Sequence, residues 1–400
     1  SASTLYGTDA ANGVIVIKTK RGVAGTPQWT YYTEQTALTD RNAYPTAYRA
    51  WRSGTTAATT STRSNSVQCF LTQKAAGSCA IDSVSSFNLH DDPETTPYGV
   101  GYRQQHGLQV KGGSETVRYF LHGEWEDEDG VTKLTQFDAR KLAAAGTPLS
   151  AIQMSPNHLN KITTRANLNI ALSPKADVTV STGYTNQDLR LPQSDDSGTA
   201  GIAANVYGGP GFKYNLTAIG DTLFGWRQFT PRDIFQSEYN QSINRMISSI
   251  GSNYRPTDWL AVRGNFGLDY LNRVDTQLCR FQNCPDIGTD RQGYKRDNRT
   301  SFYTYTLDAG ATATKSLSQS IESKTTVGVQ MYRTLFDRNG ATGLVLPPGA
   351  TTVTAGATAQ ADESTSESRT LGAFVEQNIG FNDRLFLTAA LRSDRNSAFG

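Results

Sequence analysis

The stretch that decides the fold is residues 161–184, KITTRANLNIALSPKADVTVSTGY. Apart from Thr164, apolar side chains occupy every second position from Ile162 to Leu172, and polar side chains lie between them from Lys161 to Asn169. Because successive side chains of a strand point to opposite faces of a sheet, this alternation predicts a strand with one apolar and one polar face. The tripeptide 173–175, Ser-Pro-Lys, interrupts the pattern, which resumes at Val178. The two halves therefore predict a β-hairpin with a tight turn.

About eleven segments with this alternation follow one another from Trp29 to the end of the sequence. The connections between them alternate between short and long. The short connections are 112–115, 173–176, 255–258, 316–320 and 381–384, and the long ones are about 38–101, 127–158, 187–237, 272–299 and 336–366. In an antiparallel meander this places all short turns on one rim and all long loops on the other, which is the asymmetry of outer-membrane barrels.

Composition narrows the class of protein. The charged fraction is 18%, mean hydropathy is −0.47, and no stretch approaches the roughly 18 apolar residues of a membrane-spanning helix. The net charge is +2, and no basic run is interleaved with aromatic residues, so nucleic acid is not an expected partner. The sequence starts at Ser1 without a targeting signal, and we expect such a signal to lie upstream or to be removed.

The first 22 residues, SASTLYGTDAANGVIVIKTKRG, follow a different pattern. Residues 14–17 are apolar at every position, which predicts a strand buried on both faces within a globular unit. A Gly- and Pro-containing linker up to Pro27 then leads into the first alternating strand. We therefore divide the chain into residues 1–27 and residues 28–400.

These 22 residues resemble the end of the plug domain in TonB-dependent receptors, and most of all the SusC/RagA type. The matching motif residues are Leu5, Tyr6, Gly7, Asn12 and Gly13. Further stretches similar to the early barrel of that family are Gln109 to Ser114 leading to Arg118–Phe120, then Asp127–Val131, then Leu391–Asp394 with Ser397–Gly400. They occur in the order found in the family.

The resemblance implies an all-β fold, an antiparallel transmembrane β-barrel that is partial and open here, with about 10 to 12 of about 22 strands. Residues 1–27 would be the C-terminal end of the plug with its linker, and the remaining strands would lie beyond Gly400. The family implies a location in the bacterial outer membrane, in contact with its lipid. The implied partners are the TonB-ExbB-ExbD energy system, reached through an N-terminal segment, and a surface lipoprotein of the SusD type.

The four cysteines form two pairs that are close in sequence, Cys69 with Cys79 and Cys279 with Cys284, and both pairs fall in long loops. Disulfides persist in oxidising compartments, so two local disulfides are the favoured interpretation. A metal site is the alternative, but the second spacing is wider than that of most zinc knuckles and no histidine is close in sequence. We expect both pairs on the rim opposite to the short turns.

The polar face of the strands supplies candidate residues for the lumen. These are Arg165, Asn167, Asn169, Arg263, Asn265 and Asp269. They are expected on the concave side, with Leu168, Ile170, Val262 and Leu268 on the convex side, because barrel interiors are polar. Aromatic residues near segment ends suit interface girdles, although sheet packing also places some there; these are Tyr119, Trp125, Tyr184, Trp259, Tyr270, Phe381 and Phe386.

No motif for catalysis, a cofactor or a metal stands out. His106 and His122 are expected on opposite faces of the sheet, so they predict no shared metal site. The acidic run 126–129 lacks the spacing of a calcium loop and is better explained as a solvated loop entrance. The sequence has no Gly-x-Ser-x-Gly or His-Glu-x-x-His pattern, and we predict that the protein is not an enzyme.

Two functions remain from these observations. The first is energy-coupled uptake of large nutrients, with oligosaccharides or peptides as the cargo implied by the resemblance. The second is a surface β protein, an adhesin or binding protein, that does not transport. The plug-like residues 1–22 favour the first, because neither a passive pore nor an adhesin requires a plug.

Overall fold

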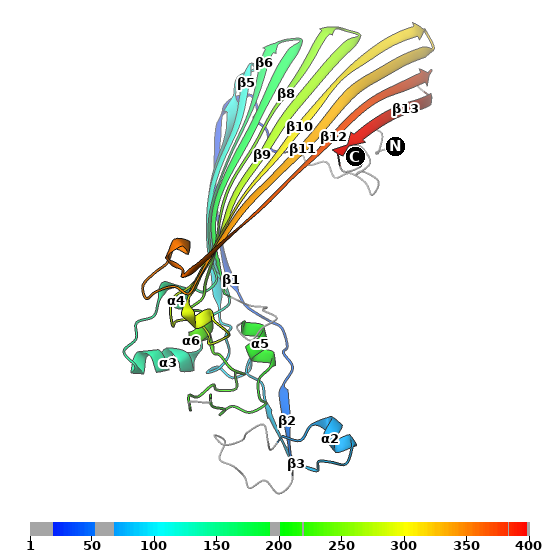
Figure 1. Cartoon of the computed structure of the whole chain (residues 1–400). Helices are drawn as coiled ribbons and strands as arrows, with labels where there is room; N and C mark the ends of the chain where they lie inside the picture. Colours follow the sequence, from blue (N-terminus) through cyan, green and yellow to red (C-terminus); the bar gives the residue numbers. More distant parts are fainter. Residues whose placement is uncertain (1–18, 53–67, 193–200, 218–219, 383, 398–400) are drawn as a thin grey trace.

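A computed structural model describes residues 19–52, 68–192, 201–217, 220–382 and 384–397. Its main feature is an antiparallel sheet of 11 strands, curved into a trough (Figure 1). The strands, in their order across the sheet, are β1 (Gly25–Leu38), β4 (Gly101–Gly113), β5 (Val117–Asp129), β6 (His158–Ser173), β7 (Ala176–Leu191), β8 (Glu238–Thr257), β9 (Leu260–Cys279), β10 (Tyr294–Ser318), β11 (Ile321–Leu344), β12 (Thr358–Phe381) and β13 (Leu385–Asn396). This confirms the all-β prediction.

The connection between β1 and β4 holds a separate two-stranded sheet, β2 (Ala47–Arg52) with β3 (Ile81–Phe87). The same connection holds the short helix α2 (Leu71–Ala75), between β2 and β3. The other long connections hold the short helices α3 (Gln136–Ala144), α4 (Ala151–Met154), α5 (Ile202–Tyr207) and α6 (Pro231–Ile234) and the 3₁₀ turns η4 (Asp290–Gln292) and η5 (Val353–Ala355). None of the helices in the described ranges is long and apolar enough to cross a membrane.

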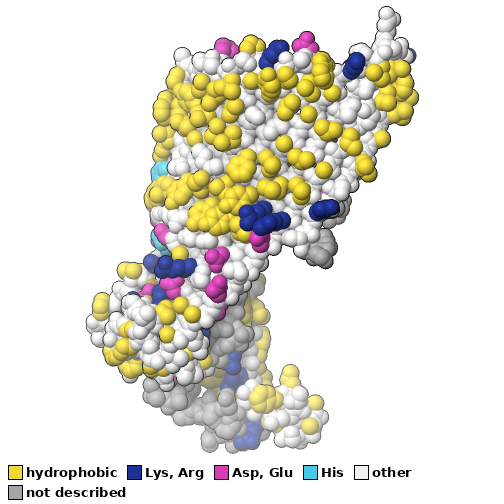
Figure 2. All heavy atoms as spheres, turned by 45° about the horizontal axis from the view of Figure 1, so that its top comes forward, with side chains coloured by type: hydrophobic (Ala, Val, Ile, Leu, Met, Phe, Trp, Pro, Cys, Tyr) yellow, Lys and Arg dark blue, Asp and Glu magenta, His cyan; other side chains and the backbone are white. Residues whose placement is uncertain are grey.

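The apolar faces of neighbouring strands are aligned across the sheet. One row runs through paired residues of seven strands, and its members are Leu168, Val180, Ile250, Phe266, Leu307, Met331 and Leu371. Several of these side chains are well exposed, with Ile250 at 55% and Leu371 at 54%. Figure 2 shows such side chains as broad apolar bands over the sheet. A soluble β protein would bury this face, so its exposure points to contact with lipid.

The short connections lie at one rim of the sheet and the long connections at the other, as predicted. The tight turns join β4 to β5, β6 to β7, β8 to β9, β10 to β11 and β12 to β13, whereas all long connections emerge at the other end. At the first tight turn Gly113 has φ 140°, and a Cβ there would lie 2.1 Å from the carbonyl oxygen of Val117. This turn therefore requires glycine.

The sheet is open. Within the described residues β1 pairs only with β4 and β13 only with β12, so both outer strands are edges. In lipid such edges leave backbone groups without partners, and membrane-spanning sheets therefore close into barrels. The open sheet agrees with the predicted partial barrel.

Strand boundaries differ from the predictions in two places. The first strand begins at Gly25, inside the linker that was predicted to end at Pro27. The strands β10, β11 and β12 run for 25, 24 and 24 residues, so their long connections are shorter than predicted. Beyond the rows of exposed apolar side chains, both faces of these strands contact water. The alternation of apolar and polar residues therefore ends there, although the backbone hydrogen bonds between the strands continue.

A compact loop cluster lies at the rim of the long connections (Figure 1). Its buried apolar residues come from three connections and are Leu89, Phe137, Ile202, Val206, Leu223, Trp226, Phe229, Ile234 and Phe235. Inside it the carboxylate of Asp138 accepts hydrogen bonds from Thr230 Oγ1 and from the backbone N–H of Arg232, both at 2.9 Å. Burial raises the pKa of Asp138 to about 6, although these hydrogen bonds oppose the shift. The cluster thus has a core of its own, held away from the sheet.

Candidate functional site

The polar face of the sheet receives the segment that precedes β1. Asn167 on β6 is only 2% exposed, and its Nδ2 donates a hydrogen bond of 2.7 Å to the carbonyl oxygen of Lys20. The ammonium of Lys20 donates to Gln109 Oε1 at 3.2 Å. A Cβ on Gly22 would lie 2.3 Å from the backbone nitrogen of Tyr119, so this glycine allows the segment to pass close to β5. Residues 20–22 therefore lie against the polar face.

A ladder of charged and amide side chains crosses the polar face from β9 to β13. Arg263 Nε lies 3.5 Å from Asp308 Oδ1, and Gln330 Nε2 donates to the other carboxylate oxygen of Asp308 at 2.8 Å. Arg392 Nη1 donates to Gln330 Oε1 at 2.6 Å and also pairs with Asp394 at 2.8 Å. These residues alternate with the exposed apolar ones on the same strands, so the two faces differ sharply in polarity.

The other lumen candidates lie on the same face but are not all joined. Asp269 pairs with Arg245, whose Nε lies 2.9 Å from Asp269 Oδ1. Asn169 Nδ2 donates to Thr179 Oγ1 at 2.8 Å. Arg165 is exposed and lines a shallow cavity of about 250 Å³ together with Asn167. Asn265 is exposed, and among the described residues it makes no hydrogen bond to the other five candidates.

Sequence reasoning missed most of this network. It named Arg263 and Asp269 but not their partners Asp308 and Arg245, nor the ladder members on β11 to β13. The partners follow from the register of the tight hairpins, because residues on the same face of paired strands meet directly or diagonally. Extending the pairing from each short turn was the signal that could have found them.

A second polar cluster lies on the same face near the start of the barrel. The Tyr32 hydroxyl donates to Glu124 and lies 2.9 Å from His122 Nε2. The ring of Tyr32 covers Gly107, where a Cβ would lie 2.2 Å from the ring carbon Cζ. Glycine at 107 is therefore required for the tyrosine to reach the other two side chains. His106 instead contacts Tyr31 on the opposite face, as expected from the sequence.

The apolar face carries a row of tyrosines toward the long loops. Tyr184, Tyr270 and Tyr303 lie in one row across β7, β9 and β10, and Tyr31 continues it on β1. Tyrosine combines an apolar ring with a polar hydroxyl and is favoured at the interface between membrane and water. Two of the predicted girdle residues, Tyr184 and Tyr270, belong to this row.

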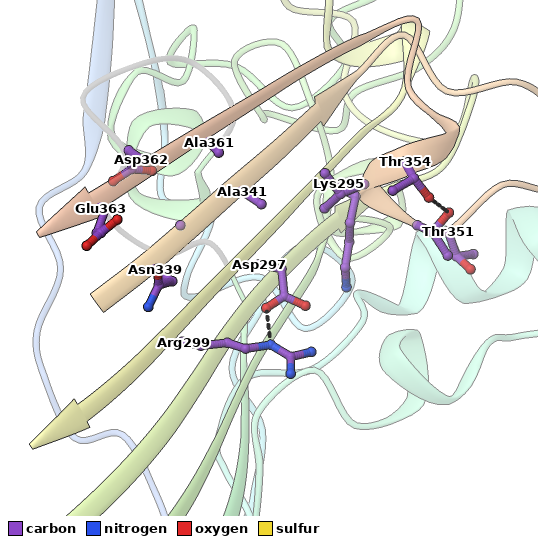
Figure 3. Close-up of a pocket in the computed structure, with 13 residues that line it drawn as sticks. Lys295, Asp297, Arg299, Asn339, Ala341, Thr351, Thr354, Ala361, Asp362 and Glu363 are labelled. Carbon is purple, nitrogen blue, oxygen red and sulfur yellow. Dashed lines mark hydrogen bonds and ion pairs between the residues drawn. The ribbon is translucent and has the colours of Figure 1, made fainter. Parts of the chain in front are cut away.

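Among the described residues, two of the cavities at the long connections have volumes of several hundred Å³. One of about 590 Å³ separates the connection after β7 from that after β9, with Arg227 and Asp286 among its charged lining residues. The other, of about 710 Å³, lies against β10 to β12 (Figure 3). Its residues Lys295 and Arg299 are an even number of positions from Tyr303 on β10, so they lie on the same face of the sheet as Tyr303. This cavity therefore opens on the apolar side of the sheet and not on the polar face.

The cysteines form two disulfides, Cys69 with Cys79 and Cys279 with Cys284. Both lie at the rim of the long connections, opposite to the tight turns. The plug motif residues Leu5, Tyr6, Gly7, Asn12 and Gly13 lie outside the described residues. In the described ranges no group of three His, Cys, Asp or Glu side chains is arranged to hold a metal ion.

No family model matches this chain, and no curated protein is significantly similar to it in sequence. Solved structures do match in fold. The chain is similar to the RagAB peptide importer in its closed-closed state with TM-score 0.67 and 15% identity over 99% of this chain and 45% of that chain. The open-open state gives TM-score 0.66 and 14% identity over 99% and 45%, and the RagAB peptide transporter gives 0.61 and 15% over 76% and 33%.

The chain therefore spans less than half the length of these structures. At this identity the likeness concerns the fold. The open 11-stranded sheet has the fold of the part of the RagAB structure that it matches, which agrees with the partial barrel predicted from the sequence. These matched structures are of a peptide transporter.

Proposed function

We propose that this chain forms one side of a TonB-linked transporter barrel in the bacterial outer membrane, which takes up large nutrients in an energy-coupled way. One observation carries the proposal. The same strands expose an apolar face and, on the other side, a polar face against which residues 20–22 lie. An apolar exterior suits lipid, and a polar interior with a chain segment against it suits a plugged barrel.

Within this proposal the residues before Gly25 are the end of the plug and its linker, a boundary slightly earlier than the predicted residues 1–27, and the barrel begins with β1 at Gly25. The ladder that includes Arg263 and Asp308 lines the lumen. Its paired charges offer hydrogen-bond donors and acceptors to a hydrated ligand or to the plug. Because the charges of this ladder are paired with one another, none of them would hold the ligand or the plug too tightly. The loop cluster around Trp226 gives the outer mouth a wall with a packed apolar core.

The cargo class follows from the likeness and the family resemblance. RagAB is a peptide importer, and the SusC/RagA resemblance adds oligosaccharides, so peptides or oligosaccharides are the proposed ligands. The proposed partners are the TonB-ExbB-ExbD system, which would act through the plug, and a surface lipoprotein of the SusD type. No enzymatic role is proposed.

The test uses the full-length protein in its native strain. Membrane fractionation should place it in the outer membrane, and its deletion should abolish uptake of at least one labelled peptide or oligosaccharide from a size-graded library. Because uptake is energy-coupled, an uncoupler of the inner-membrane proton gradient should abolish the same uptake. Unchanged uptake of every library member in the deletion strain would refute the transport proposal and favour the surface-binding alternative.

A further inference from the structure

Three arginines cluster on the apolar face of the sheet, at the edge of the exposed band. Arg333 on β11 lies directly opposite Arg369 on β12. Arg395 on β13 lies opposite Leu371, and is therefore a diagonal neighbour of Arg369. Figure 2 shows Lys and Arg side chains gathered at the border of the apolar band.

The alternation along each strand places these arginines on the outside of the barrel. Arg333 and Arg369 share their face with Met331 and Leu371, two residues away on the same strands. Met331 also lies opposite Leu307, so a continuous apolar surface begins directly beside the guanidinium groups. The guanidinium of Arg333 lies 6.0 Å from the centre of the Tyr305 ring, which belongs to the same face. The cluster therefore stands where hydrocarbon gives way to headgroups.

The cluster has more positive than negative charge. Glu367 is shared by two of its members, since Arg333 Nε lies 2.6 Å from its Oε1 and Arg369 Nε donates to the same oxygen. Within the described part of the chain Arg395 has no ion pair or hydrogen bond, and it is exposed. Three arginines against one glutamate leave two positive charges facing outward, and Arg369 is 61% exposed.

We propose that Arg333, Arg369 and Arg395 bind the phosphate groups of a phosphorylated glycolipid of the outer leaflet. Its acyl chains would lie over Leu371 and Met331. A guanidinium binds phosphate through two parallel N–H···O bonds, which a planar fork is shaped to form. The neighbouring apolar surface selects an amphiphile over free phosphate, because only an amphiphile gains from both surfaces. The inference rests on the proposed outer-membrane location.

The experiment titrates purified full-length protein in neutral detergent with a fluorescent glycolipid that carries two phosphates on a glucosamine disaccharide. The double variant Arg333→Gln/Arg369→Gln should bind it about tenfold or more weakly, because each charge-assisted bond contributes about a factor of ten. Adding Arg395→Gln should weaken binding further. The matched control is Arg296→Gln/Arg338→Gln, which removes the same charge from the polar face of β10 and β11 and should bind like the wild type.

Two further binding measurements distinguish a phosphorylated glycolipid from free phosphate as the ligand. The same glycolipid without phosphates should bind wild type and double variant equally weakly, and inorganic phosphate should not displace the glycolipid at equal concentration. Equal affinity of wild type and double variant for the phosphorylated glycolipid overturns the inference, and so does displacement by equimolar inorganic phosphate. Recovery of the full-length protein outside the outer membrane would instead refute the proposed function, so the two failures are distinguishable.

Discussion

Exchanging Val329 for arginine tests which face of the sheet meets lipid. Val329 is the middle one of three outward apolar residues of β11, and Arg333 is about 13 Å away along the strand. The residues opposite it, Ala309 and Ala373, are small, so the longer side chain has room. An arginine on the lipid face near the bilayer midplane costs about 2 to 4 kcal/mol. We expect Val329→Arg to lower the free energy of unfolding by that amount, about 30-fold to 1000-fold in the folding equilibrium.

The matched control is Tyr332→Arg on the opposite face of the same strand. Val329 is 44% exposed and Tyr332 is 47% exposed, so accessible area alone predicts equal effects. If the polar face is a wet lumen, Tyr332→Arg should cost less than about 1 kcal/mol. The difference between the two variants therefore reports the surroundings of each face rather than the size of the change.

The assay folds the full-length protein into lipid vesicles and unfolds it with guanidinium chloride, with tryptophan fluorescence as the signal. Linear extrapolation gives the free energy of unfolding for each variant. Equal destabilisation by both variants, or a larger effect of Tyr332→Arg, would show that the apolar face is not the lipid face.

Three further predictions concern the loops. Because the folded loop cluster raises the pKa of Asp138 to about 6, it binds this proton more tightly than the unfolded chain does, and its free energy of unfolding should fall by about 3 kcal/mol as pH rises from below 4 to above 6. The difference between wild type and Asp138→Asn in thermal unfolding from pH 3 to pH 8 should show this slope; a difference independent of pH contradicts it. Trp226 is 0% exposed, so the substitution Trp226→Ala should lower the free energy of unfolding of the loop cluster by about 3 to 5 kcal/mol. Hydrogen exchange of residues 201–217 measures this loss. Replacing Cys279 and Cys284 by serine should cost only about 2 kcal/mol of local stability, because the disulfide closes a loop with a sequence separation of 5, and a loss of barrel folding on gels would contradict this.

The sequence predicted the sheet well because one physical rule governs most of it. A strand between lipid and a polar lumen must alternate, so Ile162 to Leu172 revealed both the strand and its two faces. The loops follow no such rule. Leu89, Phe137 and Trp226 pack together from three connections, and nothing periodic in the sequence links them. Their contacts depend on how each connection is anchored, which only the three-dimensional structure supplies.

The charged ladder lies between these two cases. Arg263 could be assigned to the polar face from alternation alone, but its partner depends on the pairing of β9 with β10. In that register Asn265 lies opposite Asp308, which brings the carboxylate diagonally to Arg263. A slip of one residue would turn Asp308 toward lipid, where an unpaired carboxylate costs several kcal/mol. The requirement that ionised side chains stay out of the hydrocarbon therefore fixes the register as strongly as the apolar residues do, and the ion pairs on the polar face follow from that constraint.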